Sequence, residues 1–174
     1  MSITLNDYEK NFLKSQEKAL QKNDFKTFFN ALTSVNSYGY YSNIVPLFIE
    51  IGIDFWKGLD SVPKYMCKGS TALESITIPE GITRIGAEAF SDCSNLKDVV
   101  LPSTLKKIEK NAFSGSSLKS LEIPESVTSL NQGCFFGCDN IKLTTPRRGG
   151  ANKLMLPKNE YDWYKDHLVF IDEE

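Results

Sequence analysis

Histidine is the scarcest residue of this chain, which has only His167 among its 174 residues. A single histidine excludes every site that needs two, such as the His-Glu-x-x-His zinc peptidases and the Cys2His2 zinc fingers. No Gly-x-Ser-x-Gly, P-loop or Gly-x-Gly-x-x-Gly motif occurs in the chain, so no known nucleophile or phosphate-binding motif accompanies His167. We therefore expect no catalytic residue and no cofactor, and we interpret the protein as a non-enzyme.

An excess of charge of one sign is also lacking, because 20 Lys and Arg residues face 22 Asp and Glu residues, for a net charge of −2. This balance argues against a nucleic-acid binder, which needs an excess of basic side chains. The longest hydrophobic run, residues 44–53, is interrupted by Pro46, Glu50 and Gly52 and is far shorter than the ~18 residues of a membrane span. The first residues show no signal peptide. We expect a cytoplasmic protein with no membrane partner.

The chain does contain an internal repeat with a period of 22–23 residues. Its three clear copies read IPEGITRIGAEAFSDCSNLKDVV, LPSTLKKIEKNAFSGSSLKSLE and IPESVTSLNQGCFFGCDNIKL. The recurring positions are Pro79, Pro102 and Pro124; Ile85, Ile108 and Leu130; Phe90, Phe113 and Phe135; and Leu96, Leu118 and Ile141. A weaker copy precedes them, with Cys67 where phenylalanine is expected. The repeat therefore predicts about four coils over residues 59–145.

The length of the repeat unit predicts its structure. A unit of 22–23 residues is too short for two full helices but accommodates a short strand, a turn and a second extended segment. Residues 73–78 and their counterparts end in alternating apolar and polar residues, which is the pattern of a strand. The proline after each strand ends it, because proline has no N–H to donate. Stacked coils then form a parallel sheet, and each coil buries its apolar face against its neighbours.

The pattern aliphatic-Pro-x-x-aliphatic-x-x-aliphatic-x-x-x-Ala-Phe-x-x-Cys-x-x-Leu resembles the BspA-type leucine-rich repeat, and residues 78–96 match it most fully. The resemblance implies a right-handed solenoid with a ladder of phenylalanines in its core. Members of this family occur in bacterial surface proteins, protozoa and phage genomes, and a short chain without a signal peptide is most similar to phage-encoded or intracellular members. We expect an α+β fold: a short right-handed leucine-rich-repeat solenoid with a parallel sheet, a helical N-terminal cap and a small C-terminal cap.

The residues on either side of the repeat predict the two caps. Apolar residues at helical spacing predict one helix from Leu5 to Leu20 and a second helix that Asp24 caps. A third helix is expected over residues 43–52, and a C-terminal helix over residues 160–168 precedes a strand over residues 169–171. The chain then divides into a helical capping region (1–58), the solenoid (59–145), and a basic loop with the C-terminal cap (146–174).

The four cysteines are further candidates for chemistry. They form no Cys-x-x-Cys pair, which argues against a zinc site. Cys93 and Cys138 occupy equivalent repeat positions two coils apart, on the order of 9–10 Å at the strand spacing, which is too far for a disulfide. We predict buried free thiols that pack as small apolar side chains, and no metal site. His167 is expected to pack in the C-terminal cap.

Two surfaces are candidates for binding a partner. Outward-pointing strand residues, with a tyrosine-rich loop as an aromatic anchor, are the candidates for a protein partner: Ser75, Thr77, Asp98, Val100, Ser120, Glu122, Tyr40 and Tyr41. A second set forms a candidate basic patch: Arg84, Lys107, Arg147 and Arg148. Ordinary solubility explains these charges equally well, and we expect any nucleic-acid binding through the patch to be weak and sensitive to salt.

A rigid repeat surface without a catalytic motif favours a non-enzymatic protein–protein interaction module. The resemblance to phage-encoded members implies that the partner is a host or phage protein in the host cytoplasm, with a host factor as the first expectation. The alternative is a structural subunit that self-associates through a strand edge or an end cap. A third hypothesis, an enzyme with a site across neighbouring coils, has no motif in its favour.

Overall fold

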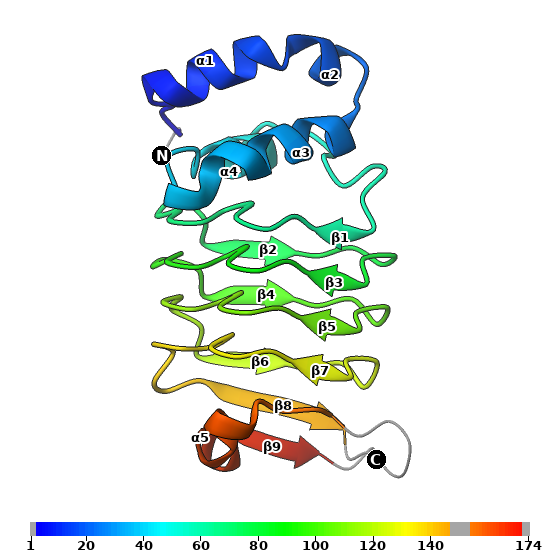
Figure 1. Cartoon of the computed structure of the whole chain (residues 1–174), viewed down its shortest axis with the longest axis vertical. Helices are drawn as coiled ribbons and strands as arrows, with labels where there is room; N and C mark the ends of the chain where they lie inside the picture. The colour runs from blue at the N-terminus through cyan, green and yellow to red at the C-terminus, as the bar shows by residue number, and fades with distance from the viewer. Residues whose placement is uncertain (1–2, 147–153, 172–174) are drawn as a thin grey trace.

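The computed structural model describes residues 3–146 and 154–171. Figure 1 shows a stack of flat coils between a layer of N-terminal helices and a helix near the C-terminus. The strands of successive coils pair in parallel along this stack, so the chain forms a parallel-sheet solenoid. The expected fold class is confirmed, with about five turns where the repeat predicts about four.

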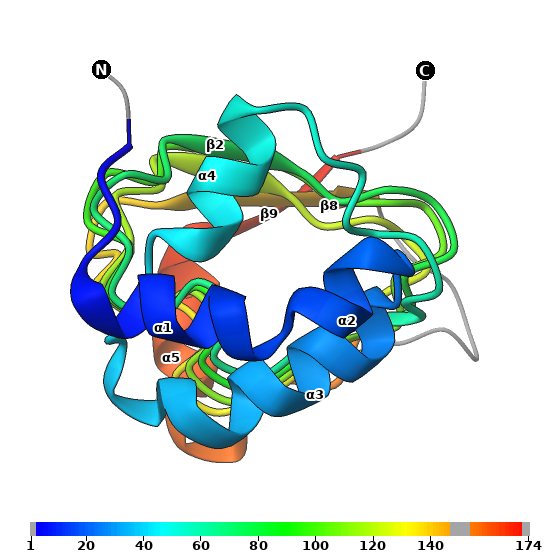
Figure 2. The same cartoon turned by 90° about the horizontal axis from the view of Figure 1, so that it is seen from above.

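The helices of the N-terminal cap are α1 (Asp7–Ser15), α2 (Glu17–Gln21), α3 (Phe25–Val35), the 3-10 helix η1 (Asn36–Tyr38) and α4 (Ile44–Glu50). Figure 2 shows that they lie across one end of the coils. The prediction of one continuous helix up to Leu20 is wrong, because the chain breaks at Gln16 between α1 and α2. The Asp24 cap is confirmed, since its side chain accepts the Thr27 N–H at 3.1 Å. Within the described residues, no helix is long and apolar enough to cross a membrane.

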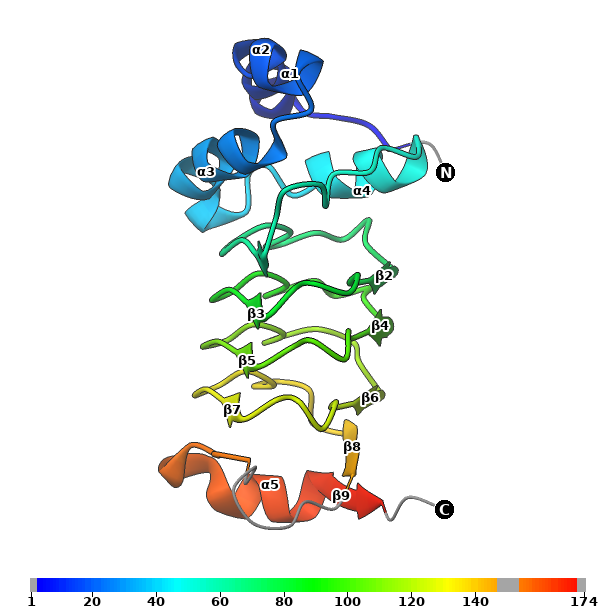
Figure 3. The ribbon, with the colours of Figure 1, turned by 90° about the vertical axis from the view of Figure 1, so that its right-hand side faces the viewer.

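The strands form two columns along the solenoid, which Figure 3 shows from the side. The first column contains β1 (Ser61–Val62), β3 (Arg84–Ile85), β5 (Lys107–Ile108) and β7 (Ser129–Leu130). The second contains β2 (Ser75–Thr77), β4 (Asp98–Val100), β6 (Ser120–Glu122), β8 (Lys142–Pro146) and β9 (Leu168–Ile171). Pairing follows the sequence period, as in the partners Ser75 and Asp98 or Ile85 and Ile108.

The second column is interrupted between β4 and β6. These two strands are neighbours in space. In the described part of the chain, however, β2 pairs with β4 in one ladder and β6, β8 and β9 pair in that order in another, without a ladder between β4 and β6. The turn before β6 is one residue shorter than its predecessor: one residue separates Ser116 from Leu118, whereas two separate Cys93 from Leu96. The interruption of the ladder coincides with this change in turn length.

Aromatic rings form a ladder through the core of the solenoid. Phe90, Phe113 and Phe135 are buried, and consecutive ring centroids are 5.2 and 5.8 Å apart with planes within 9° and 3° of parallel. Trp163 of α5 (Tyr161–His167), which follows the 3-10 helix η3 (Lys158–Glu160), stacks on Phe135 at 6.5 Å. The phenylalanine ladder that the resemblance implies is confirmed, and α5 covers its C-terminal end.

Candidate functional site

The first candidate surface is the outward face of β2, β4 and β6, which we call the strand face. Its members are the six strand residues that the sequence predicts to point outward: Ser75, Thr77, Asp98, Val100, Ser120 and Glu122. All six are exposed, whereas the residues between them, Ile76, Val99 and Leu121, pack toward the core, because successive side chains of a strand point to opposite faces.

The strand face combines one apolar side chain with short polar and charged ones. Val100 has 57% of its surface exposed and is the register partner of Thr77. Asp98 supplies a negative charge on the same strand, and Lys142 of β8 supplies a positive charge beside Ser120. Such mixed chemistry suits the surface of a protein better than a uniformly charged polymer.

The second candidate surface is a group of exposed tyrosines on the helical cap, Tyr8, Tyr38 and Tyr40, which we call the tyrosine cluster. Their exposed fractions are 65%, 80% and 58%, respectively. The ring of Tyr40 stacks on Tyr8 at 5.9 Å and lies 6.1 Å from the ring of Tyr38. The structure separates the two predicted anchors, because Tyr41 is half-buried and packs edge-on against Phe12 at 5.3 Å.

Buried hydrogen bonds hold the loop that carries Tyr40. Asn36 is fully buried, its Nδ2 donates to the Tyr65 carbonyl at 2.6 Å, and its Oδ1 accepts the Tyr41 N–H at 2.9 Å. Asn6 Nδ2 donates to the Tyr40 carbonyl at 3.1 Å. These hydrogen bonds fix the backbone beneath the tyrosine cluster.

Tyr8 is not among the predicted anchors, because it belongs to the residues at helical spacing that predict the first helix. In α1 the buried residues are Phe12 and Glu9, so Tyr8 lies on the solvent side. Glu9 is buried because its carboxylate accepts the N–H groups of Asn6 at 2.9 Å and Asn43 at 2.7 Å. The pair Asn6 and Glu9 is a capping box, and this three-residue spacing is the sequence signal for the start of α1.

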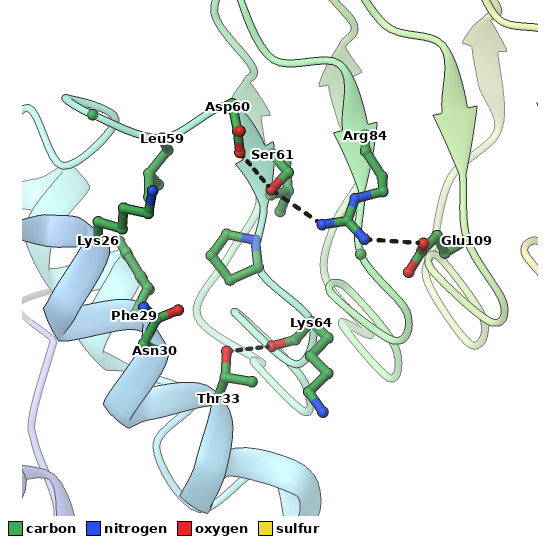
Figure 4. A pocket seen from close by; sticks show the side chains of 14 residues that line it. Lys26, Phe29, Asn30, Thr33, Leu59, Asp60, Ser61, Lys64, Arg84 and Glu109 are labelled. Atoms are coloured by element: carbon green, nitrogen blue, oxygen red, sulfur yellow. Dashed lines mark hydrogen bonds and ion pairs between the residues drawn. The ribbon is translucent and has the colours of Figure 1, made fainter.

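The predicted basic patch lies only partly within the described residues. Arg84 and Lys107 are register partners, and both reach the Glu109 carboxylate, with N–O distances of 3.3 and 3.8 Å. Figure 4 shows Arg84 between Glu109 and Ser61, beside a groove of about 270 Å³ that separates α3 from the first coils. Glu109 therefore offsets part of the positive charge. Arg147 and Arg148 lie outside the described residues.

The four cysteines, Cys67, Cys93, Cys134 and Cys138, are free and buried. Burial raises the pKa of the Cys93 and Cys134 thiols to about 12. Thiols that hold their protons so firmly are poor nucleophiles and poor metal ligands at neutral pH. Across residues 3–146 and 154–171, no group of three or more His, Cys, Asp or Glu residues is arranged to hold a metal ion.

His167 connects the C-terminal cap to the preceding coil. Its ring stacks on Trp163 at 4.0 Å, with Nδ1 lying 2.7 Å from the Trp163 carbonyl oxygen and Nε2 lying 3.2 Å from that of Asp139. A backbone carbonyl oxygen thus lies within hydrogen-bond distance of each ring nitrogen. This arrangement gives His167 the packing role that the sequence predicts for it.

Solved structures of bacterial proteins resemble parts of the chain. A leucine-rich cell surface protein from Faecalibacterium prausnitzii is 36% identical, with a TM-score of 0.41, over 42% of this chain and 20% of that chain. A leucine-rich repeat protein from Bacteroides ovatus is 32% identical, with a TM-score of 0.47, over 50% of this chain and 23% of that chain. The pneumococcal vaccine antigen PcpA is 17% identical, with a TM-score of 0.40, over 68% of this chain and 40% of that chain. This chain therefore spans about a fifth of the length of the first two proteins.

A family model gives the assignment for the repeat itself, while no curated protein matches the chain. The model describes the BspA type leucine rich repeat region, and it matches residues 60–149 with six copies. These residues make up slightly more than half of the sequence and include the strands from β1 to β8. The chain belongs to the BspA-type leucine-rich repeat family.

Proposed function

We propose that the protein is a non-enzymatic interaction module whose strand face binds a protein partner. The observation that carries this proposal is the array of six exposed side chains that β2, β4 and β6 hold side by side around Val100. A repeat solenoid supports the proposal because its stacked coils form an extended and rigid surface. The leucine-rich repeat family supports the same broad function.

The tyrosine cluster is the proposed anchor of this module, with Tyr8 and Tyr38 in place of the half-buried Tyr41. Tyrosine is enriched at the centres of protein interfaces because its ring gives a large contact area and its hydroxyl keeps a hydrogen-bond partner. The buried network around Asn36 supports this role, since an ordered anchor loses little freedom on binding.

Phage origin, a host protein as the partner and a cytoplasmic location stay predictions of the sequence. The description as a cell surface protein belongs to the F. prausnitzii structure. The strand face itself requires only a partner with complementary polar groups and a small apolar contact for Val100.

The test compares two lysine substitutions of exposed apolar residues. Val100→Lys places a charge in the strand face, and Phe136→Lys places the same charge at a turn residue that is 76% exposed. Each full-length variant and the wild type are immobilised and incubated with bacterial lysates. We expect the wild type and Phe136→Lys to retain one protein in stoichiometric amount and Val100→Lys to retain at least tenfold less. Equal retention by Val100→Lys, or no stoichiometric protein from several lysates, would contradict the proposal.

Strand β9 favours self-association as a second candidate function. It is the outer strand of the order β6-β8-β9, and its Val169, Phe170 and Ile171 are 42%, 49% and 41% exposed. Edge strands of soluble proteins are commonly protected by charged residues or proline, and Leu168–Ile171 contains neither. A second copy of this chain fits such an edge, because a strand pairs with its own copy in antiparallel orientation about a twofold axis.

Light scattering at high protein concentration tests this candidate. We expect a dimer for the wild type and a monomer for Val169→Lys, because a charge on β9 opposes pairing of two apolar edges. Phe136→Lys adds the same charge away from β9 and should leave the dimer unchanged. A wild type that stays monomeric at every concentration rules out the second candidate.

A further inference from the structure

A groove of about 740 Å³ lies where the N-terminal segment, α4 and the turn before β2 meet. Its walls include Ile3, Ile49, Glu50, Ala72 and Glu74, and we call it the N-terminal groove. The N-terminal wall is fixed by the Ile3 N–H, which donates to Glu50 Oε2 at 2.9 Å. Asn95 of the next coil also lines the groove, so the walls come from four segments that the fold brings together, and the segment before β2 leads directly into the strand face.

The N-terminal groove is continuous with the strand face. Ser75 lines the groove and is also the first residue of β2, whose side chains form one end of the strand face. The register partner of Ser75 is Asp98, so a polypeptide that leaves the groove along the sheet next meets this carboxylate. A partner bound to the strand face can therefore extend a segment into the groove.

The groove offers apolar contacts that the fold leaves uncovered. Ile49 of α4 is 43% exposed, and Ile3 and Ala72 on the other walls are half-buried. Burial of an aliphatic side chain of a ligand against these residues removes apolar surface of both molecules from water. The apolar walls consequently favour a ligand with aliphatic side chains.

The charged groups of the groove have one sign. Its charged lining residues within the described chain are Glu50 and Glu74, and the lining includes no lysine or arginine. Glu74 is exposed on the wall next to Ser75, while Glu50 also holds the Ile3 N–H. By contrast, charges of both signs line the groove beside α3: Lys26, Lys64, Arg84, Asp60 and Glu109. The two carboxylates of the lining attract a positively charged ligand, while Lys97, whose backbone N–H donates to the Glu74 carbonyl at 2.9 Å, lies outside the lining.

We propose that the N-terminal groove binds an extended segment of the protein partner in which a lysine or arginine lies next to aliphatic residues. This inference rests on the proposed function, because it names the chemistry of one part of the same partner. The cationic side chain pairs with Glu74, the aliphatic side chain packs on Ile49, and the adjoining backbone runs toward Ser75. The remainder of the partner then lies on the strand face.

Two synthetic peptides test the inference on the full chain. Both are capped, fluorescently labelled hexapeptides, one alternating lysine with leucine and the other alternating glutamate with leucine, and fluorescence anisotropy measures their dissociation constants. We expect the lysine peptide to bind saturably and at least tenfold more tightly than the glutamate peptide. Glu74→Lys should weaken the lysine peptide at least tenfold, and Ile49→Ser should weaken it severalfold. Equal affinity for the two peptides would overturn the inference.

Glu125→Lys is the matched control, because it makes the same charge change at an exposed residue outside the N-terminal groove. It should leave the affinity for the lysine peptide unchanged. If Glu125→Lys weakens binding as much as Glu74→Lys does, the net charge of the protein alone attracts the peptide and the inference is wrong. Far-UV circular dichroism verifies that each variant is folded. Retention of a lysate protein that depends on Val100, together with no selective peptide binding, refutes the groove and leaves the proposed function standing. Selective peptide binding without any retained lysate protein would support the groove and contradict the proposed function.

Discussion

Removal of the ring of Phe113 should cost more stability than any exposed substitution in the chain. Phe113 is fully buried, with Phe90 5.2 Å away on one side and Phe135 5.8 Å away on the other. A buried Phe→Ala change costs about 3–5 kcal/mol through lost transfer free energy and the remaining cavity. A domain has about 5–15 kcal/mol of stability, so Phe113→Ala should lose a large share of it.

Urea unfolding followed by far-UV circular dichroism measures this loss as a shift of the midpoint. Phe113→Leu keeps most of the volume but removes both ring stacks, so it should cost about 1–3 kcal/mol. The matched control is Phe136→Ala, whose ring is 76% exposed and whose effect should stay within about 0.5 kcal/mol. If Phe113→Ala costs no more than Phe136→Ala, the aromatic ladder does not stabilise the solenoid and this account of the core is wrong.

Three further predictions concern the first coil, the thiols and the helical cap. Gly86→Ala places a Cβ 2.6 Å from Lys64 N and 2.7 Å from the Val62 carbonyl oxygen, so it should destabilise the chain by at least about 1–3 kcal/mol in urea unfolding. Burial raises the pKa of the Cys93 thiol from about 9 to about 12. Between these two pH values the folded thiol keeps its proton while the unfolded thiol loses it. The free energy of unfolding should therefore fall as the pH rises from about 9 to about 12. In Cys93→Ala the free energy of unfolding should decrease less steeply with pH, by up to about 1.4 kcal/mol per pH unit. Urea titrations at several pH values measure this slope. Glu9→Ala removes the acceptor of the Asn6 and Asn43 N–H groups and should cost about 0.5–1.5 kcal/mol for each, which thermal unfolding would detect.

The repeat period accounts for how much of the solenoid is predictable from the sequence. A spacing of 23 residues places Arg84 beside Lys107 and Ser75 beside Asp98, and the structure pairs these residues in that register. The alternation of apolar and polar residues within each strand also correctly predicts which side chains point inward and which point outward. It does so because successive side chains of any strand point to opposite faces. Period and alternation together therefore predict the positions of the strand face.

Features outside the repeat required the three-dimensional structure. Trp163 continues the phenylalanine ladder from a helix that shares no sequence pattern with the coils, so no spacing argument links it to Phe135. The gap between β4 and β6 coincides with a turn that is one residue shorter near Leu118, and the strand pattern alone does not predict this gap. The N-terminal groove is formed by segments far apart in sequence, including Ile49 and Glu74, and their approach depends on how the cap packs on the first coil.

Site-specific photo-crosslinking is the most direct test of the central claim that the strand face binds a protein partner. A benzophenone amino acid replaces either Val100 or Phe136, both exposed apolar positions, and each full-length protein is irradiated in a bacterial lysate. The account predicts one discrete crosslinked species from position 100 and none from position 136. Crosslinking of equal intensity at the two positions, or none at position 100 while the protein still retains a partner, would contradict it.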